Sequence, residues 1–311
     1  MCIRDRLQAA NTVLQHRGPD DAGVWINDSA TCGLGHTRLS IIDLPGGQQP
    51  LSSADGTIHA VVNGEFYGYE SIRHDFIRDG YRFLTESDSE ILIPLYLKYG
   101  LDCVQQRRGE FALILWEENA RRLVLARDRF GIKPLFYGEH QESVYVASEV
   151  KALLARGMPA RWDPKTVADE ERGNRNCQDT LFRNVKAIEP GHLMVFESGR
   201  RQSRKYWDFD YPQQSELKAT RSQPRYIDEF WSLLSEAATL RLRADVPVGV
   251  YLSGGIDSAT VLALMRQQIG TDLDAFTLSF DQTAYDEGDI ARDMAAHAGV
   301  RHTVIDIAPS D

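Results

Sequence analysis

The spacing of apolar residues changes near residue 225, and this change constrains the fold more than any other feature of the chain. Before that point, short runs rich in β-branched and aromatic residues are separated by Gly, Pro, Asn and Asp, a pattern that predicts strands. The runs are Gly23–Ile26, Gly33–Leu39, Ile58–Val62, Phe111–Trp116, Arg122–Ala126, Val144–Ala147 and His192–Phe196. Helical spacing interrupts them at Tyr69–Asp79 and Ser87–Tyr99. Many strands with a few helices favour an α+β sandwich.

Beyond residue 225, segments with strand and helix patterns alternate. The helical patterns cover Ile227–Arg243, Ala259–Ile269 and Glu287–Ala298, and the strand patterns cover Val246–Leu252, Ala275–Phe280 and His302–Ile307. This alternation predicts an α/β unit with a parallel sheet and crossover helices. Residues 198–225 are polar and poor in aliphatic side chains, which is typical of a linker. We therefore expect domains at 1–205 and 225–311, with a linker at 206–224.

Composition excludes several classes of protein. The 311 residues include 35 Lys and Arg against 45 Asp and Glu, and no basic stripe stands out, so nucleic acid is not an expected partner. The longest apolar runs are too short for a membrane span of about 20 residues. The four cysteines are far apart and form no C-x-x-C pair: Cys2, Cys32, Cys103 and Cys177. A disulfide framework or a zinc site is not expected, and a reducing cytoplasm is the expected location.

The loop Ser253–Ser258 joins a predicted strand to a predicted helix and reads Ser-Gly-Gly-Ile-Asp-Ser. A helix N-terminus presents unpaired N–H groups, and Gly254 and Gly255 leave the backbone open to an anion. The serine hydroxyls add donors, and the Asp257 carboxylate suits a Mg²⁺ ion that bridges phosphates. No G-x-x-x-x-G-K-[ST] motif is present. The alternative is a tight turn with Asp and Ser as helix caps; we favour a phosphate site.

The loop resembles the pyrophosphate-binding motif of the N-type ATP pyrophosphatases. The longer segment Asp245–Ser258 is similar to the synthetase domain of glutamine-dependent asparagine synthetases, as are Phe276–Phe280, Tyr285–Glu287 and Gly299–His302. The resemblance implies that ATP adenylates the side-chain carboxylate of aspartate, and that ammonia then displaces AMP. It also implies that Leu252 and Leu278 contact the adenosine through backbone groups.

The first half carries a matching series of motifs, in the order that the family shows. They are His16–Gly23, His36–Asp43, Val62–Glu65, Ser87–Glu90, Ala126–Tyr137 and Ala147–Ala152. This series resembles the class II glutamine amidotransferases. The resemblance implies an α+β N-terminal-nucleophile sandwich, the class II glutaminase fold, followed by the start of an α/β parallel-sheet ATP pyrophosphatase domain.

Glutamine is a zwitterion with a neutral amide, so its pocket needs a cation and an anion. Arg38 suits the carboxylate and Asp88 the ammonium group, while Asn63 and the Gly64 N–H suit the oxyanion of amide hydrolysis. The resemblance adds Ile41, Ile42 and Glu65 to the pocket. The alternatives are a surface ion pair for Arg38, a helix N-cap for Asp88 and a hairpin turn for Asn63–Gly64.

The resemblance makes Cys2 the nucleophile, with its own α-amine as the base. The family follows this cysteine with Gly and an apolar strand, but Ile3–Arg6 is largely charged and only the helix Leu7–Gln15 fits before His16. A cysteine placed there by accident is therefore an equal alternative. We expect the natural gene to encode Cys-Gly and an apolar strand, and to continue past Asp311.

The expected function is ATP- and Mg²⁺-dependent amidation of aspartate with ammonia from glutamine, in an asparagine synthetase (glutamine-hydrolysing). Glutamine, ATP and aspartate are the expected small-molecule partners, and a homodimer is an option for its assembly. One alternative is a related amidotransferase that acts on another carboxylate, of the β-lactam or polysaccharide type. Another is a non-catalytic remnant that binds glutamine or a nucleotide.

Overall fold

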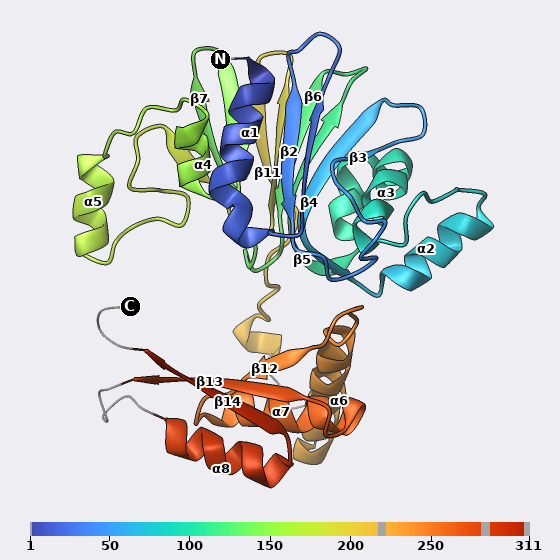
Figure 1. Ribbon diagram of the computed structural model, residues 1–311, viewed down its shortest axis with the longest axis vertical. Helices are drawn as coiled ribbons and strands as arrows, with labels where there is room; N and C mark the ends of the chain where they lie inside the picture. Colours follow the sequence, from blue (N-terminus) through green and yellow to red (C-terminus); the bar gives the residue numbers. More distant parts are fainter. Residues whose placement is uncertain (1, 217–221, 281–286, 308–311) are drawn as a thin grey trace. The chain divides into compact units, whose positions relative to one another are not determined.

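A computed structural model describes residues 2–216, 222–280 and 287–307. The chain forms two compact units, Met1–Tyr211 and Pro212–Asp311 (Figure 1). Among the described residues, none of the helices combines the length and the apolar character that crossing a membrane requires.

The centre of the first unit is a six-stranded antiparallel sheet with the order β11-β10-β6-β5-β4-β3. Its strands are β3 (Leu51–Ser52), β4 (Ile58–Tyr67), β5 (Arg108–Glu117), β6 (Arg122–Arg127), β10 (His192–Glu197) and β11 (Arg200–Lys205). Successive side chains of a strand point to opposite faces. Phe111, Leu113 and Leu115 of β5 therefore share one buried face of the sheet.

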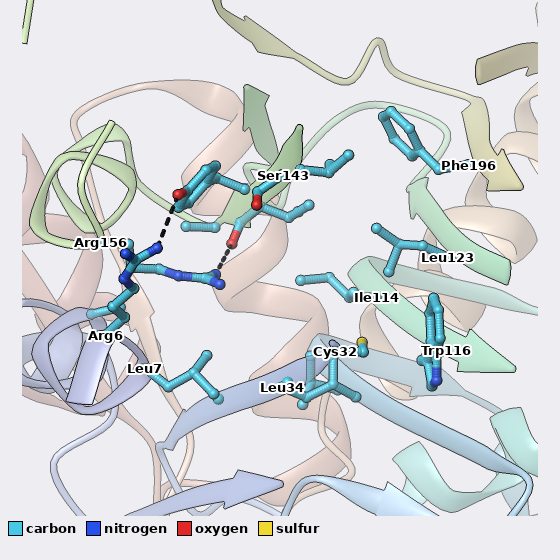
Figure 2. A pocket seen from close by; sticks show the side chains of 18 of the residues that line it. Arg6, Leu7, Cys32, Leu34, Ile114, Trp116, Leu123, Ser143, Arg156 and Phe196 are labelled. Atoms are coloured by element: carbon cyan, nitrogen blue, oxygen red, sulfur yellow. Dashed lines mark hydrogen bonds between the residues drawn. The ribbon is translucent and has the colours of Figure 1, made fainter. Parts of the chain in front are cut away.

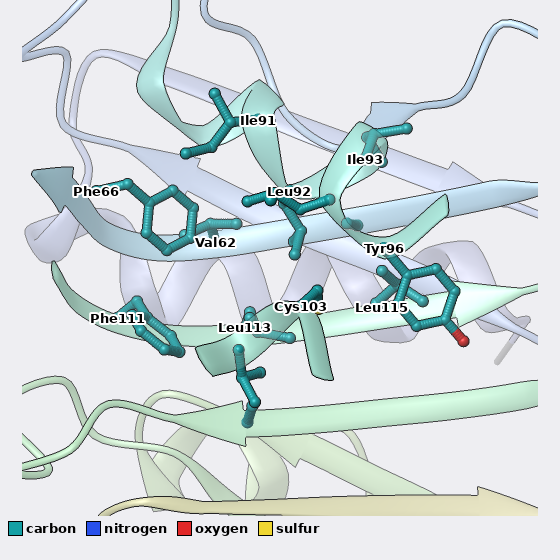
Figure 3. Close-up of a cluster of buried hydrophobic side chains, with 14 of the residues drawn as sticks. Val62, Phe66, Ile91, Leu92, Ile93, Tyr96, Cys103, Phe111, Leu113 and Leu115 are labelled. Atoms are coloured by element: carbon teal, nitrogen blue, oxygen red, sulfur yellow. The ribbon is translucent and has the colours of Figure 1, made fainter. Parts of the chain in front are cut away.

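Helices cover this face and form the largest core with it (Figure 3). They are α2 (Tyr69–Arg78), η2 (Asp88–Ile91), α3 (Leu92–Tyr99) and η3 (Gly100–Gln105). Ile91 and Leu92 are fully buried and pack in the same cluster as Phe66 and Leu113. Each such side chain contributes about 1.5–3 kcal/mol by leaving water.

The second layer of the unit consists of two separate sheets. One pairs β1 (Asp21–Ile26) with β2 (Gly33–Arg38), and the other has the order β8-β7-β9, with β7 (Phe136–His140), β8 (Ser143–Ala147) and β9 (Val185–Ala187). Leu125 of the six-stranded sheet and Val146 of β8 pack together between the layers. On the outer side, α1 (Ile3–Leu14) and α4 (Val150–Ala155) pack on β8 and β9; α5 (Pro164–Glu171) follows α4. The resulting helix–sheet–sheet–helix order confirms the predicted α+β sandwich.

Two expectations about local structure in this unit were wrong. The first helix begins at Ile3 rather than Leu7, because Cys2 and Asp5 form a capping box in which Cys2 Sγ accepts from the Asp5 N–H. The polar stretch from residue 198 is not all linker, because Arg200–Lys205 pairs with β10 as the edge strand β11. Edge strands tolerate charged side chains, so polarity alone did not reveal this strand.

The second unit contains a parallel sheet with the order β12-β13-β14, as the alternating pattern predicts. Its strands are β12 (Gly249–Tyr251), β13 (Asp274–Phe280) and β14 (Arg301–Ile307), and its helices are η4 (Gln214–Glu216), α6 (Gln223–Leu240), α7 (Ile256–Ile269) and α8 (Gly288–Ala298). Leu252, Leu262, Ala275 and Ala291 belong to its buried core. Because the strands are parallel, their carboxyl ends lie at one edge of the sheet.

Candidate functional site

A cavity of about 1070 Å³ lies in the first unit where the second layer is interrupted. Figure 2 shows its walls: Leu34 of β2, Ser143 of β8, Leu7 of α1 and Ile114 of the six-stranded sheet. The cavity thus occupies the space between the edges of β2 and β8.

Asn63 of β4 lines this cavity. Its Nδ2 is buried and has no hydrogen-bond partner among the described residues. A buried donor without a partner is costly and calls for an explanation. An acceptor on a bound molecule would satisfy it.

Gly64 follows Asn63 in the middle of β4, so the pair does not form a hairpin turn. Its φ is +146°, and a Cβ there would collide with the carbonyl oxygen of Glu110. Only glycine fits this position.

Asp88 is tied to the same strand. Its Oδ2 accepts the backbone N–H of Phe66 at 2.7 Å, and only 5% of the residue is exposed. Ser87, not Asp88, is the N-cap of η2. Burial raises the pKa of Asp88 above its ordinary value. The structure therefore brings Asp88 next to the segment that carries Asn63, Gly64 and Glu65.

Arg38 ends β2 and is buried, so it does not form a surface ion pair. Its guanidinium donates to the carbonyl oxygens of Ile42 at 3.0 Å, Asp43 at 2.7 Å and Leu44 at 3.2 Å. These bonds hold the loop that contains Ile41 and Ile42 against the end of β2. Arg38 is not among the residues that line the cavity, so it supports this loop as well as being a candidate ligand.

His36 was not predicted as a site residue, although it belongs to a quoted motif. It lines the cavity, and its Nε2 bonds to the carbonyl oxygen of Val62, which ties β2 to the residue before Asn63. Burial lowers the pKa of His36 to about 4, so the ring is neutral near pH 7. Sequence reasoning also missed Cys32 and Arg156, which line the cavity but lie outside the quoted motifs.

Cys2 is exposed at the N-cap of α1, and its backbone N–H donates to Asp5 Oδ2 at 3.0 Å. Asn11, on the third turn of α1, bonds to the His36 carbonyl oxygen and so lies near Asn63. Asn11 lies nine positions after Cys2, which corresponds to a rise of about 13 Å along a helix. The structure does not bring Cys2 to Asn63.

The predicted phosphate loop joins β12 to α7 at the carboxyl edge of the parallel sheet. Gly255 is the N-cap of α7, and the Ser253 N–H and the Gly255 carbonyl both bond to the Ser258 hydroxyl. The loop thus presents the first N–H groups of α7 at the strand ends, the position in which α/β proteins bind phosphates.

The two residues predicted to contact adenosine flank the same edge. Leu252 directly follows β12. Its N–H donates to the carbonyl oxygen of Phe276, and its carbonyl oxygen accepts from the Thr277 hydroxyl of β13. Leu278 is half-exposed two residues beyond Phe276. Both residues therefore lie toward the carboxyl ends of their strands, where the loop begins.

The residues of the loop fit a nucleotide and its Mg²⁺ ion. Asp257 is exposed in the first turn of α7, where a carboxylate and phosphate oxygens provide the hard ligands that Mg²⁺ prefers. The described residues contain no group of three or more His, Cys, Asp and Glu side chains that would hold a metal alone. In the motif Tyr285–Glu287, Tyr285 and Asp286 lie outside the described residues, and Glu287 lies at the start of α8.

Comparison with known families accounts for both units. Residues 3–207 match the family model of the glutamine amidotransferase domain. The chain belongs to the glutamine amidotransferase family. Residues 229–311 match the family model of asparagine synthase.

Two curated relatives show what this amidotransferase resembles. It is 41% identical to "Amidase chry2" of Gibberella zeae, over 96% of this chain and 46% of that protein. It is 33% identical to "Asparagine synthetase [glutamine-hydrolyzing] 1" of Bacillus subtilis, over 98% of this chain and 47% of that protein. The chain thus spans about half the length of the curated relatives it matches.

A solved structure described as the allosteric regulatory enzyme of purine biosynthesis is 16% identical and superimposes with a TM-score of 0.50. The match covers 96% of this chain and 77% of that chain. At this identity the likeness concerns the fold. It supports an N-terminal-nucleophile sandwich, and the asparagine synthase match supports a partial ATP pyrophosphatase domain after it.

Proposed function

We propose that this chain carries the glutamine site and the ATP-phosphate loop of an enzyme that amidates aspartate to asparagine. The observation that carries the proposal is Asn63, which lines the cavity and whose Nδ2 is a buried donor without a partner among the described residues. Amide hydrolysis develops an oxyanion, and a prearranged donor of this kind stabilises it. Family membership supports glutamine as the source of ammonia.

In the proposed glutamine site, Arg38 binds the carboxylate and Asp88 the ammonium group of glutamine. Ile41, Ile42 and Glu65 complete the pocket, and Asn63 and Gly64 hold the oxyanion. The three carbonyl bonds of Arg38 use two guanidinium nitrogens and support its position. A bound ammonium group favours the ionised form of Asp88 and offsets the effect of burial on its pKa.

Cys2 is the proposed nucleophile. Once Met1 is removed, the α-amine of Cys2 takes the thiol proton and the sulfur adds to the carboxamide carbon. The amine passes this proton to the leaving nitrogen as the C–N bond breaks and ammonia departs, and water then cleaves the thioester to release glutamate. The cap position of Cys2 has to change for this step, because α1 holds the sulfur away from Asn63. Cys32 lines the cavity, but burial raises the pKa of its thiol to about 12, so it is not a thiolate near pH 7.

In the proposed ATP site, Leu252 and Leu278 contact adenosine, and Ser253, Gly254, Gly255 and Ser258 contact the phosphates. Asp257 would hold the Mg²⁺ ion, which neutralises phosphate charge when it is bound. Aspartate attacks the α-phosphate, pyrophosphate leaves, and ammonia displaces AMP from aspartyl-AMP. We also propose a cytoplasmic location and, as an option, a homodimer.

A specific observation favours a second acceptor. The relative at 41% identity is named an amidase, while the asparagine synthetase is 33% identical. A carboxylate other than aspartate is therefore the alternative acceptor. The exposed position of Cys2 favours the other alternative, a non-catalytic binding protein.

Glutamine hydrolysis without ATP or an acceptor separates these alternatives. We expect the protein to release ammonia from glutamine, Cys2→Ser to abolish the release, and Cys177→Ser, a change at another exposed cysteine, to leave it intact. A protein that binds glutamine in calorimetry but releases no ammonia would be a binding module. Equal activity of Cys2→Ser and the parent would exclude Cys2 as the nucleophile.

A further inference from the structure

The phosphate loop already holds a carboxylate in the structure. The backbone N–H of Gly254 donates to Glu287 Oε2 at 3.0 Å. The other bonded N–H groups of the loop differ, because Ser253 and Gly255 donate to serine hydroxyls of the loop itself. An acidic side chain from another element thus occupies one N–H group of an anion-binding loop.

The contact depends on close packing between the loop and α8. A Cβ on Gly254 would lie 2.9 Å from the Cβ of Glu287 and 3.2 Å from the Cβ of Ile290. Glu287 is the N-cap residue of α8, yet its side chain makes no capping bond to that helix. The carboxylate is therefore directed to the loop instead of to its own helix.

The charge of Glu287 has the same sign as a phosphate. Anions at such a loop are held by backbone N–H groups, and a carboxylate oxygen uses these groups as a phosphate oxygen does. Asp257 places a second carboxylate in the first turn of α7. A polyphosphate that enters without a cation has to displace the Glu287 carboxylate from the Gly254 N–H and to approach the Asp257 carboxylate.

From this geometry we propose that Glu287 is an internal anion on the phosphate loop, which an entering polyphosphate displaces from the Gly254 N–H. The inference rests on the proposed function of the loop. It adds that Glu287 lowers the affinity of the loop for a polyphosphate, because its carboxylate competes for the Gly254 N–H. Loss of the carboxylate should strengthen the binding of a metal-free polyphosphate.

The test is calorimetric titration of the whole chain with inorganic pyrophosphate, in EDTA and in excess Mg²⁺. A charge-assisted hydrogen bond is strong enough to change an affinity about tenfold or more. We expect Glu287→Ala to bind metal-free pyrophosphate about tenfold more tightly than the parent, and Glu287→Gln to lie between them. The matched control is Asp289→Asn, which removes the same charge from the first turn of α8, where Asp289 pairs with Arg292. It should change the affinity less than threefold.

Equal affinities of Glu287→Ala and Asp289→Asn would overturn the inference and leave the phosphate loop in place. Weaker binding by Glu287→Ala only in Mg²⁺ would also overturn it, and would make Glu287 a metal ligand. If no variant bound pyrophosphate in either condition, the proposed phosphate site would itself be wrong. The Gly254 amide resonance supplies a check without ligand. At one fixed pH it should differ between the parent and Glu287→Ala and should agree between the parent and Asp289→Asn; the same resonance position in the parent and Glu287→Ala would contradict the contact.

Discussion

The two proposed sites differ in what their polar groups bind. Arg38 and Asp88 are 6% and 5% exposed and bond to the backbone of neighbouring segments. In the phosphate loop, Ser253 and Asp257 are exposed, and the serine hydroxyls bond within the loop. The glutamine site is thus built into the folded core, whereas the phosphate loop is an open surface feature. Substitution of Arg38 or Asp88, which bond to the backbone, should therefore affect stability, whereas substitutions in the phosphate loop should mainly affect binding.

The largest expected effect is at Asp257. We expect Asp257→Asn to lower Mg²⁺-dependent pyrophosphate release in the amidation reaction by about a thousandfold, because the metal loses its carboxylate ligand. The free energy of unfolding should fall by only about 0.5–1 kcal/mol, the contribution of an acid to the dipole of α7. Pyrophosphate release and thermal unfolding measure the two effects. Release near the parent rate would reduce Asp257 to a helix-end residue.

Asn63→Ala tests whether a buried group of the glutamine site can affect glutamine hydrolysis without affecting stability. Loss of one oxyanion donor lowers glutamine hydrolysis by about 100- to 1,000-fold. The melting temperature should stay unchanged, because Nδ2 has no partner to lose among the described residues. A large drop in melting temperature with unchanged hydrolysis would give Asn63 a structural role only.

Arg38→Ala should lower both the rate of glutamine use and the free energy of unfolding. We expect glutamine use to fall by about 30- to 1,000-fold and ammonia-dependent synthesis to persist, because the ATP site lies in the other unit. The unfolding free energy should fall by about 2–4 kcal/mol, since three carbonyl groups lose a charged donor. Activity with both nitrogen sources and denaturant unfolding provide the measurements. Equal loss with glutamine and ammonia would mean that Arg38 acts only on the fold.

The last prediction is a dependence of stability on pH, which involves no ligand. The pKa of His36 is about 4 when folded and about 6.5 when unfolded, so only the unfolded state binds the proton between these values. The resulting stability is present above pH 6.5 and is lost as the pH falls toward 4, by about 3 kcal/mol. Unfolding of the parent and His36→Gln at several pH values isolates this contribution. Parallel profiles for the two proteins would contradict it.

Periodicity predicted the central strands β4, β5, β6 and β10 and the helices of the second unit, because burial on one face leaves a regular apolar pattern. It did not predict β3, β7, β9, α4 or α5. Strand β11 escaped prediction because Arg200–Lys205 has no buried side chain. The start of α1 escaped because a cysteine and an aspartate supply its cap. Main-chain pairing and capping depend on geometry that the apolar pattern does not encode.

The site residues also divide into those that the motifs named and those that only the structure revealed. The motifs singled out Asn63 and Asp88, and the fold ties Asp88 to Phe66, three residues along β4 from Asn63. They did not reveal the bonds of Arg38 to three carbonyl groups. His36 and Arg156 came to notice only as walls of the cavity. Their placement depends on strand pairing between distant segments, and no local spacing records it. The roles of Arg38, Asn63, Asp88, Cys2 and Asp257 all stay predictions.

Strand β11 also affects how the protein behaves at high concentration. An edge strand exposes unpaired N–H and carbonyl groups, which can pair with another molecule and start aggregation. Arg200–Lys205 carries four cationic side chains and pairs on one side with β10. Two such strands meeting edge to edge would bring like charges together. The opposite edge of the sheet is the two-residue strand β3, which is too short to act as a template. Colloidal stability in this unit should therefore depend on salt, because ions screen the repulsion between β11 strands.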